Sequence, residues 1–127
     1  MIDFSKYNVL AVDDVPLNLL LVEKMLSKFQ FRIRKAGNGR IALEEIDKEK
    51  PDLILLDLMM PEVDGFEVLR RVRENPETAD IRIVILSALN STEDIVRGYQ
   101  LGANDFITKP IIMEKLVNCV ATQLQLL

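Results

Sequence analysis

Short runs rich in Val, Ile and Leu alternate five times along this chain with longer segments of helical period. Asp, Asn, Gly and Pro separate the two kinds of segment, as is typical of connections between strands and helices. The strands that this pattern predicts are Asn8–Val12, Arg32–Lys35, Leu53–Leu56, Arg82–Leu86 and Asp105–Ile107. The predicted helices are Pro16–Phe29, Arg40–Lys48, Gly65–Glu74, Thr92–Leu101 and Ile112–Gln125.

The third and fourth predicted strands contain the continuous apolar runs LILL and IVIL. Such runs are expected where helices cover both faces of a parallel sheet. With right-handed crossovers, five such units predict a flavodoxin-like (βα)5 α/β fold, a doubly wound parallel sheet with strand order 2-1-3-4-5. The 127 residues are 49% apolar and can fill one core, so we expect a single domain over residues 1–127.

Composition excludes several classes of protein. No apolar run approaches the roughly 20 residues needed to span a bilayer, and the first residues lack a signal peptide's basic and apolar regions. We therefore expect a cytoplasmic protein with no membrane partner. The net charge of −4 argues against direct binding to nucleic acid. A single cysteine, Cys119, excludes an internal disulfide and a Cys-based zinc site, and we expect it to be a buried or half-buried apolar side chain.

Three carboxylates follow two strands that should be neighbours. Asp13 and Asp14 end the first predicted strand, and Asp57 ends the third. In the predicted strand order the switch point lies between these two strands, where ligands of such sheets bind. Like charges in a partly desolvated site disfavour ionisation, and a hard cation such as Mg²⁺ would offset this repulsion. The alternative is that Asp13 and Asp14 form only a turn before the helix at Pro16.

A hydroxyl and an ammonium group belong to the same edge of the sheet. Ser87 ends the fourth strand and Lys109 follows the fifth. Together with the carboxylates they suit phosphoryl transfer to an aspartate, in which a metal, a lysine and a hydroxyl neutralise the phosphoryl oxygens. Taken separately, Lys109 could be a solvated lysine and Ser87 an ordinary loop hydroxyl. The chain contains no histidine, so the usual general base and transition-metal ligand are missing.

The segment DLMMPEVDG, from Asp57 to Gly65, resembles the acceptor region of the receiver domains of two-component response regulators, the chemotaxis-regulator-like family. The resemblance covers almost the whole chain, because four further pairs occur in the expected order. They are Asp13-Asp14, Ser87-Ala88, Gly102-Ala103 and Lys109-Pro110. The resemblance implies a phosphoacceptor at Asp57 and a cis peptide bond before Pro110.

The resemblance also implies a ligand set and a switch. Mg²⁺ would be held by Asp14, Asp57 and the backbone carbonyl of Met59, and Asp13 would act mainly through a metal-bound water. Ser87 and Lys109 would contact the phosphoryl oxygens. Movement of Ser87 would be coupled to inward rotation of Phe106, which changes the face made by the fourth helix, fifth strand and fifth helix. Phe106 could equally be a plain core residue.

Two apolar residues border the predicted site, Met59 two positions after Asp57 and Leu89 two positions after Ser87. Neither side chain can readily orient an attacking water, so we predict slow self-hydrolysis of the phosphorylated state. The alternative is that they only cover the rim. No enzymatic activity is predicted beyond Mg²⁺-dependent self-phosphorylation and slow self-dephosphorylation.

A chain without histidine must receive its phosphoryl group from a partner, and the resemblance implies a sensor histidine kinase or a histidine phosphotransfer protein. Helical periodicity predicts that the first helix turns one apolar face to the core. The residues of that face are Leu21, Val22, Met25, Leu26 and Phe29. Leu17 and Leu20 point away from it, so we expect them to be exposed and to suit docking of a helical bundle that carries the histidine. The alternative is that they are ordinary exposed leucines without a function.

The last helix is apolar on more than one side, which permits a homodimer through the fourth and fifth helices. The apolar residues are Ile112, Met113, Leu116, Val117 and Val120. The sequence leaves the output partner open, as well as whether the chain acts alone or belongs to a longer protein.

Three other functions were weighed. A receiver-like docking module that is never phosphorylated usually lacks an acid, the acceptor or the lysine, and all are present here. A phosphohydrolase resembling haloacid dehalogenases needs a second acid where this chain has Met59. A flavodoxin-type electron carrier needs a Ser/Thr/Gly-rich phosphate loop after the first strand, where Asp13 and Asp14 would repel the flavin phosphate.

Overall fold

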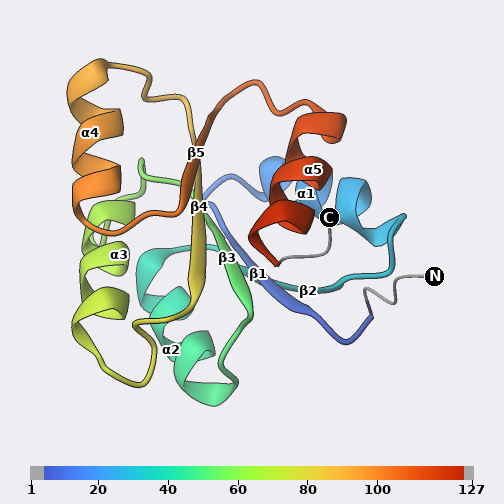
Figure 1. Ribbon diagram of the computed structural model, residues 1–127, viewed down its shortest axis with the longest axis horizontal. Coiled ribbons are helices and arrows are strands. Elements are labelled where there is room, and N and C mark those ends of the chain that lie inside the picture. The colour runs from blue at the N-terminus through green and yellow to red at the C-terminus, as the bar shows by residue number, and fades with distance from the viewer. Residues whose placement is uncertain (1–4, 125–127) are drawn as a thin grey trace.

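The protein is described by a computed structural model over residues 5–124. Its centre is a five-stranded sheet in the order β2-β1-β3-β4-β5, and every neighbouring pair is parallel. The strands are β1 (Asn8–Val12), β2 (Arg32–Ala36), β3 (Leu53–Leu56), β4 (Arg82–Ser87) and β5 (Asp105–Thr108). The predicted flavodoxin-like α/β fold and its strand order are confirmed (Figure 1).

Five helices connect and flank the strands. They are α1 (Pro16–Ser27), α2 (Gly39–Lys48), α3 (Gly65–Glu74), α4 (Thr92–Gln100) and α5 (Met113–Gln123). α1 ends two residues before its predicted end at Phe29, and Gln30 follows with a φ of 66°, which cannot continue a right-handed helix. The predicted end of the last helix, at Gln125, lies outside the described residues, as do both ends of the predicted domain over residues 1–127.

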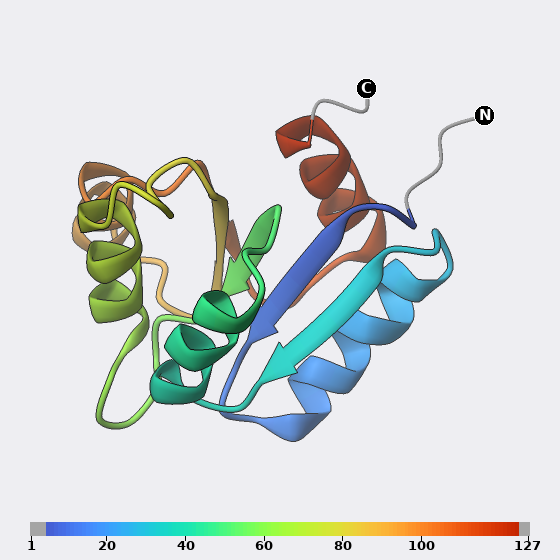
Figure 2. The ribbon, with the colours of Figure 1, turned by 90° about the horizontal axis from the view of Figure 1, so that it is seen from below.

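The helices form two layers. α1 and α5 cover one face of the sheet, while α2, α3 and α4 cover the other (Figures 1 and 2). Alternate strand residues point to opposite faces, so Val9 and Ala11 belong to the core under α1 and α5, whereas Leu10 and Val12 belong to the core under α2 and α3. This double burial explains why the central strands are apolar throughout.

The core face of α1 differs from the prediction. Leu21, which was expected in the core, is 44% exposed, and the buried residues of the helix are Leu19, Val22 and Leu26. The N-terminal half of α1 is leucine-rich on every side, so periodicity alone did not define the buried face. The predicted exposure of Leu17 and Leu20 is confirmed, at 61% and 42%.

Arg73 connects several segments at the end of the sheet opposite the carboxyl ends of the strands. Its guanidinium donates to the carbonyls of Gly102, Ala79 and Ile81 at 2.9, 3.0 and 2.6 Å, and to Oδ1 of Asn104 at 2.9 Å. The last turn of α3 is thereby tied to the turn that follows α4. None of the helices within residues 5–124 is long and apolar enough to cross a membrane.

Candidate functional site

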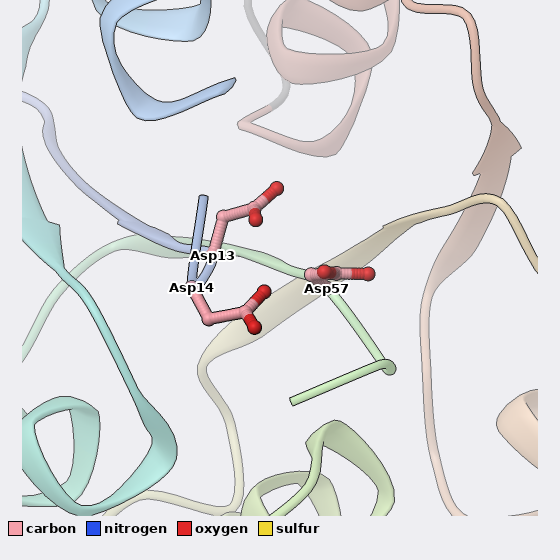
Figure 3. A group of neighbouring side chains, drawn as sticks. All are labelled: Asp13, Asp14 and Asp57. Carbon is pink, nitrogen blue, oxygen red and sulfur yellow. The ribbon is translucent and has the colours of Figure 1, made fainter. Parts of the chain in front are cut away.

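Three carboxylates lie together at the carboxyl ends of β1 and β3 (Figure 3). One oxygen from each of Asp13, Asp14 and Asp57 lies within 4.8 Å of the others. Asp13 and Asp57 are buried, and Asp14 is exposed. The parallel register aligns the last residues of the two strands, Val12 and Leu56, so that the residues that follow them meet at the switch point. The predicted convergence of the three acids is confirmed.

Lys109 reaches into this cluster from the end of β5. Its Nζ lies 2.9 Å from Oδ2 of Asp13 and 3.8 Å from Oδ2 of Asp57, and its side chain is largely buried. The backbone N–H of Lys109 donates to the carbonyl of Ser87 at 2.9 Å. The peptide bond between Lys109 and Pro110 is cis, as the resemblance implied. The closer pairing of Lys109 with Asp13 was not predicted, because the sequence indicates only which strand end each residue follows.

The pKa of Asp57 lies above its ordinary value. Burial is the main cause, and the charges of Asp13 and Asp14 act in the same direction. The Lys109 ammonium and the N–H of Met59, which donates to Oδ1 of Asp57 at 3.3 Å, oppose the shift only in part. With three carboxylates and one ammonium group, the cluster has an excess of acidic groups over basic ones.

The donor set fits Mg²⁺. Carboxylate oxygens are the ligands that this hard cation prefers, and it keeps several waters rather than requiring a complete protein cage. The exposure of Asp14 leaves one side of the cluster open to such waters. Met59 follows Asp57 at the rim, where its carbonyl was predicted to be a ligand, and its side chain is 54% exposed.

The connection from β3 to α3 is shaped by Asp64 and Gly65. Asp64 caps α3, its Oδ1 accepting the N–H of Glu67 at 2.9 Å. A Cβ on Gly65 would collide with the carbonyl oxygen of Asp57 and with Cα of Leu58. This end of the motif therefore allows α3 to begin close to the backbone of Asp57. Glu62 adopts a φ of 63°, which is uncommon for a residue other than glycine, and no sequence signal identified it.

Ser87 is the last residue of β4, and Phe106 lies within the neighbouring strand β5, level with Ile85. Ser87 is fully buried, and its Oγ accepts the N–H of Leu89 at 3.2 Å. Phe106 is half-buried and packs against the core under α2 and α3. Leu17 and Leu20, by contrast, lie on the outer surface of α1 and do not belong to the cluster of acids.

Fold and site together define a flavodoxin-like α/β domain with an acidic centre at its topological switch point. The model of the response regulator receiver domain family matches residues 9–121. The chain belongs to that family.

Relatives in this family differ greatly in length. The chain is 41% identical to the response regulator PleD of Caulobacter vibrioides over 81% of its own length, but it spans only 23% of PleD. It is 34% identical to the protein PilH of Pseudomonas aeruginosa, with 88% of this chain and 93% of PilH covered. The chemotaxis protein CheY4 of Vibrio cholerae has a similar structure, with a TM-score of 0.86, 30% identity, and 91% and 97% of the two chains covered.

Proposed function

We propose that this chain is a phosphorylation-dependent switch that accepts a phosphoryl group on Asp57. The observation that carries the proposal is the cluster itself. Asp57 is buried and its pKa is raised, and the Lys109 ammonium lies within ion-pair distance of both Asp57 and Asp13. Positive charge placed next to such a carboxylate stabilises its ionised form.

In the proposed reaction a carboxylate oxygen of Asp57 attacks the phosphorus of a phosphohistidine on the partner. A P–O bond forms, the P–N bond breaks, and the histidine nitrogen leaves with the electron pair. Asp14, Asp57 and the carbonyl of Met59 would hold Mg²⁺, with Asp13 acting mainly through a metal-bound water. The bound ion would supply positive charge to the phosphoryl oxygens. Lys109 contributes its ammonium to one phosphoryl oxygen, and Ser87 donates its hydroxyl to another.

The switch is proposed to begin at Ser87. In the present structure its Oγ accepts a hydrogen bond from the backbone N–H of Leu89. A hydroxyl has a donor site as well as acceptor sites, so the same group can donate to a phosphoryl oxygen. Phe106 is on the neighbouring strand and only half-buried. Movement of Ser87 toward the phosphoryl group would allow the ring to turn inward and change the face made by α4, β5 and α5.

The proposed phosphorylated state is long-lived. Met59 and Leu89 border the site with apolar side chains, the first exposed and the second half-buried. Neither can hold a water in line with the phosphorus. Replacing Met59 with Asn should shorten the lifetime of the phosphorylated state, measured as the decay of the adduct by mass spectrometry. A wild-type lifetime of seconds, unchanged by the substitution, would contradict this part of the proposal.

The proposed partner is a sensor histidine kinase or a histidine phosphotransfer protein that docks a helical bundle on α1. Leu17 and Leu20 are exposed there, and so is Leu21. Leu21 also lines a mostly apolar hollow of about 250 Å³ between α1 and the segment after β5. Its other lining residues are Asn18, Met25, Lys109, Pro110 and Ile111. Since Lys109 belongs to the acidic cluster as well, a helix seated in this hollow would bring its histidine next to Asp57.

A homodimer through α4 and α5 remains a proposal with a smaller surface than the sequence indicated. Leu116 and Val120 are buried in the core and cannot face a second copy. Ile112 and Met113 are exposed, as are Val96 and Tyr99 on α4.

The phosphoryl-acceptor proposal is tested with acetyl phosphate or phosphoramidate and Mg²⁺, followed by intact-mass measurement. One phosphoryl adduct, lost in Asp57→Asn and on chelation of Mg²⁺, is expected. An unchanged mass would support the unphosphorylated docking module, repeated turnover of an unrelated phosphoester would support a phosphohydrolase, and a yellow cofactor would support a flavodoxin.

The docking proposal has a separate test. Leu17→Ser and Leu20→Ser should slow phosphoryl transfer from a phosphohistidine protein but leave the reaction with acetyl phosphate unchanged. Val96→Ser, an exposed position on α4, is the matched control and should leave both reactions at the wild-type rate. Equal rates for all four proteins would exclude docking through these leucines.

A further inference from the structure

The β3–α3 loop, residues 58–64, lies beside the start of α2 (Figure 2). Gly39 is the first residue of α2 and is buried. A Cβ at this position would overlap the carbonyl oxygen of Val63 and lie 2.9 Å from Cβ and Cγ1 of the same residue, closer than real Cβ atoms approach other heavy atoms. The helix and the loop therefore meet backbone to backbone, and only a glycine at position 39 leaves room for the carbonyl.

The need for glycine at position 39 concerns space. Its φ lies outside the left-handed region that favours glycine, since Gly102 is the only glycine of residues 5–124 found there. Gly37, two residues earlier in the connection between β2 and α2, is exposed and would place a Cβ in open space. Of these two glycines, only Gly39 requires the missing side chain for the packing of another segment.

The start of α2 is held firmly in place. Ala36, the last residue of β2, pairs with Val12 in the sheet, and its carbonyl accepts the N–H of Asp13 at 3.1 Å. Asn38 then caps the helix, its Oδ1 accepting the N–H of Ile41 at 2.8 Å. The position at which α2 begins is thus fixed by the sheet and by its own cap.

The hydrogen bonds that shape the β3–α3 loop lie near its two ends. The N–H of Met59 donates to Oδ1 of Asp57 at 3.3 Å, and the N–H of Gly65 donates to the carbonyl of Leu58 at 3.2 Å. Val63 is only half-buried, and it is the residue through which the loop contacts Gly39. A side chain at position 39 should therefore displace the loop rather than the helix.

We propose that Gly39 is a positioning residue for the β3–α3 loop and, through this loop, for the Met59 carbonyl that would bind Mg²⁺. The contact with Val63 sets how closely the loop approaches α2. Mg²⁺ demands near-ideal octahedral geometry, so displacement of one ligand weakens its binding. The role in metal binding rests on the proposed function, whereas the contact between Gly39 and the loop does not depend on it.

The contact is tested first without metal. In NMR spectra recorded in EDTA, Gly39→Ala should displace the amide signals of residues 58–64 at least about twice as far as Gly37→Ala does, because packed segments must shift to admit a methyl. Gly37→Ala is the matched control, since it adds the same methyl where no atom would meet it. Equal displacements in the two variants, or displacements confined to α2, would overturn the proposal.

A second variant relieves the collision from the side of the loop. Val63→Gly removes two of the three atoms that the added methyl would meet and frees the backbone around the third. In this background Gly39→Ala should displace the loop signals less than in wild type, and it should restore folding if Gly39→Ala alone does not fold. If neither protein folded, Gly39 would be a packing residue of the whole fold and the proposal would be wrong.

Metal affinity distinguishes positioning from a general loss of structure. Calorimetric titration of Gly39→Ala should give a dissociation constant for Mg²⁺ about 10-fold or more above that of wild type, with Gly37→Ala unchanged. Binding of Ca²⁺, which accepts more variable coordination, should be weakened less. Equal weakening for the two ions would indicate partial unfolding and contradict the positioning role, as would an unchanged affinity for Mg²⁺.

The same titrations separate this inference from the proposed function. If wild type bound no Mg²⁺ and gained no phosphoryl group from acetyl phosphate, the proposed function would be refuted, and the amide displacements in EDTA would decide the role of Gly39 in placing the loop. If wild type bound Mg²⁺ and was phosphorylated, while Gly39→Ala bound the ion equally well, the positioning role alone would be refuted.

Discussion

Replacing Asp57 with Asn should stabilise the protein when Mg²⁺ is absent. The substitution keeps the size and shape of the side chain but removes one of three negative charges that share the rim. Because Asp57 is buried and its pKa is raised, its ionised form opposes folding. We therefore expect Asp57→Asn to be more stable than wild type.

The expected change in the free energy of unfolding follows from the distances between the charged groups. With an effective dielectric of about 20, unit charges 4.8 Å apart repel by about 3.5 kcal/mol, and opposite charges 3.8 Å apart attract by about 4.4 kcal/mol. Asp57 faces two carboxylates at the first distance or less and Lys109 at the second. Since Asp14 is exposed and its charge is screened by solvent, we expect Asp57→Asn to raise the free energy of unfolding by about 1–3 kcal/mol at neutral pH.

The pH dependence has a definite sign. The folded pKa of Asp57 is raised above the ordinary 3.8, so the native state binds this proton more tightly than the unfolded chain does. As the pH falls through the folded pKa, wild type takes up the proton and gains stability relative to the variant. The advantage of the variant is therefore largest above the folded pKa of Asp57 and disappears as the pH approaches 3.8.

The assay is urea unfolding at several pH values, with EDTA and with millimolar Mg²⁺. Mg²⁺ binding should stabilise wild type more than the variant and so reduce the difference. Asp47→Asn removes an exposed carboxylate on α2 and is the matched control, with a change below about 0.5 kcal/mol. Equal or lower stability of Asp57→Asn in EDTA, or a difference that Mg²⁺ leaves unchanged, would refute the reasoning.

Three further predictions concern positions outside the acidic cluster. Arg73→Ala removes a guanidinium that donates four hydrogen bonds and should lower the free energy of unfolding, measured by urea titration, by about 2–4 kcal/mol. Arg71→Ala, which loses an exposed ion pair, is the control and should lower it by less than about 1 kcal/mol. Glu62→Asn should stabilise the protein by about 0.5–1 kcal/mol, because Asn tolerates the observed φ of 63° better, and an unchanged or lower thermal midpoint would contradict this. Burial and the neighbouring Asp105 carboxylate raise the pKa of the Cys119 thiol to about 12. Alkylation of Cys119 by iodoacetamide at mildly alkaline pH should therefore be far slower in the folded protein than in the urea-unfolded protein. Similar rates in the two states would contradict the raised pKa of this thiol.

Most of the fold and the composition of the site could be predicted from local patterns. Five apolar runs separated by helical segments are sufficient to predict a parallel sheet, and handedness of the crossovers restricts the strand order. Once that order is known, residues that follow β1, β3 and β5 must meet at one edge. Asp13, Asp14, Asp57 and Lys109 were identified in this way, and Ser87 as the last residue of β4.

Contacts between distant segments needed the structure. The leucine-rich half of α1 allows more than one buried face, and only packing on the sheet selected Leu19 in place of Leu21. The partner of Lys109 and the contacts of Arg73 depend on distances between groups far apart in the chain. Sequence periodicity predicts which residues share a face of one helix or strand. The residues that each of them contacts depend on how all the helices and strands pack together.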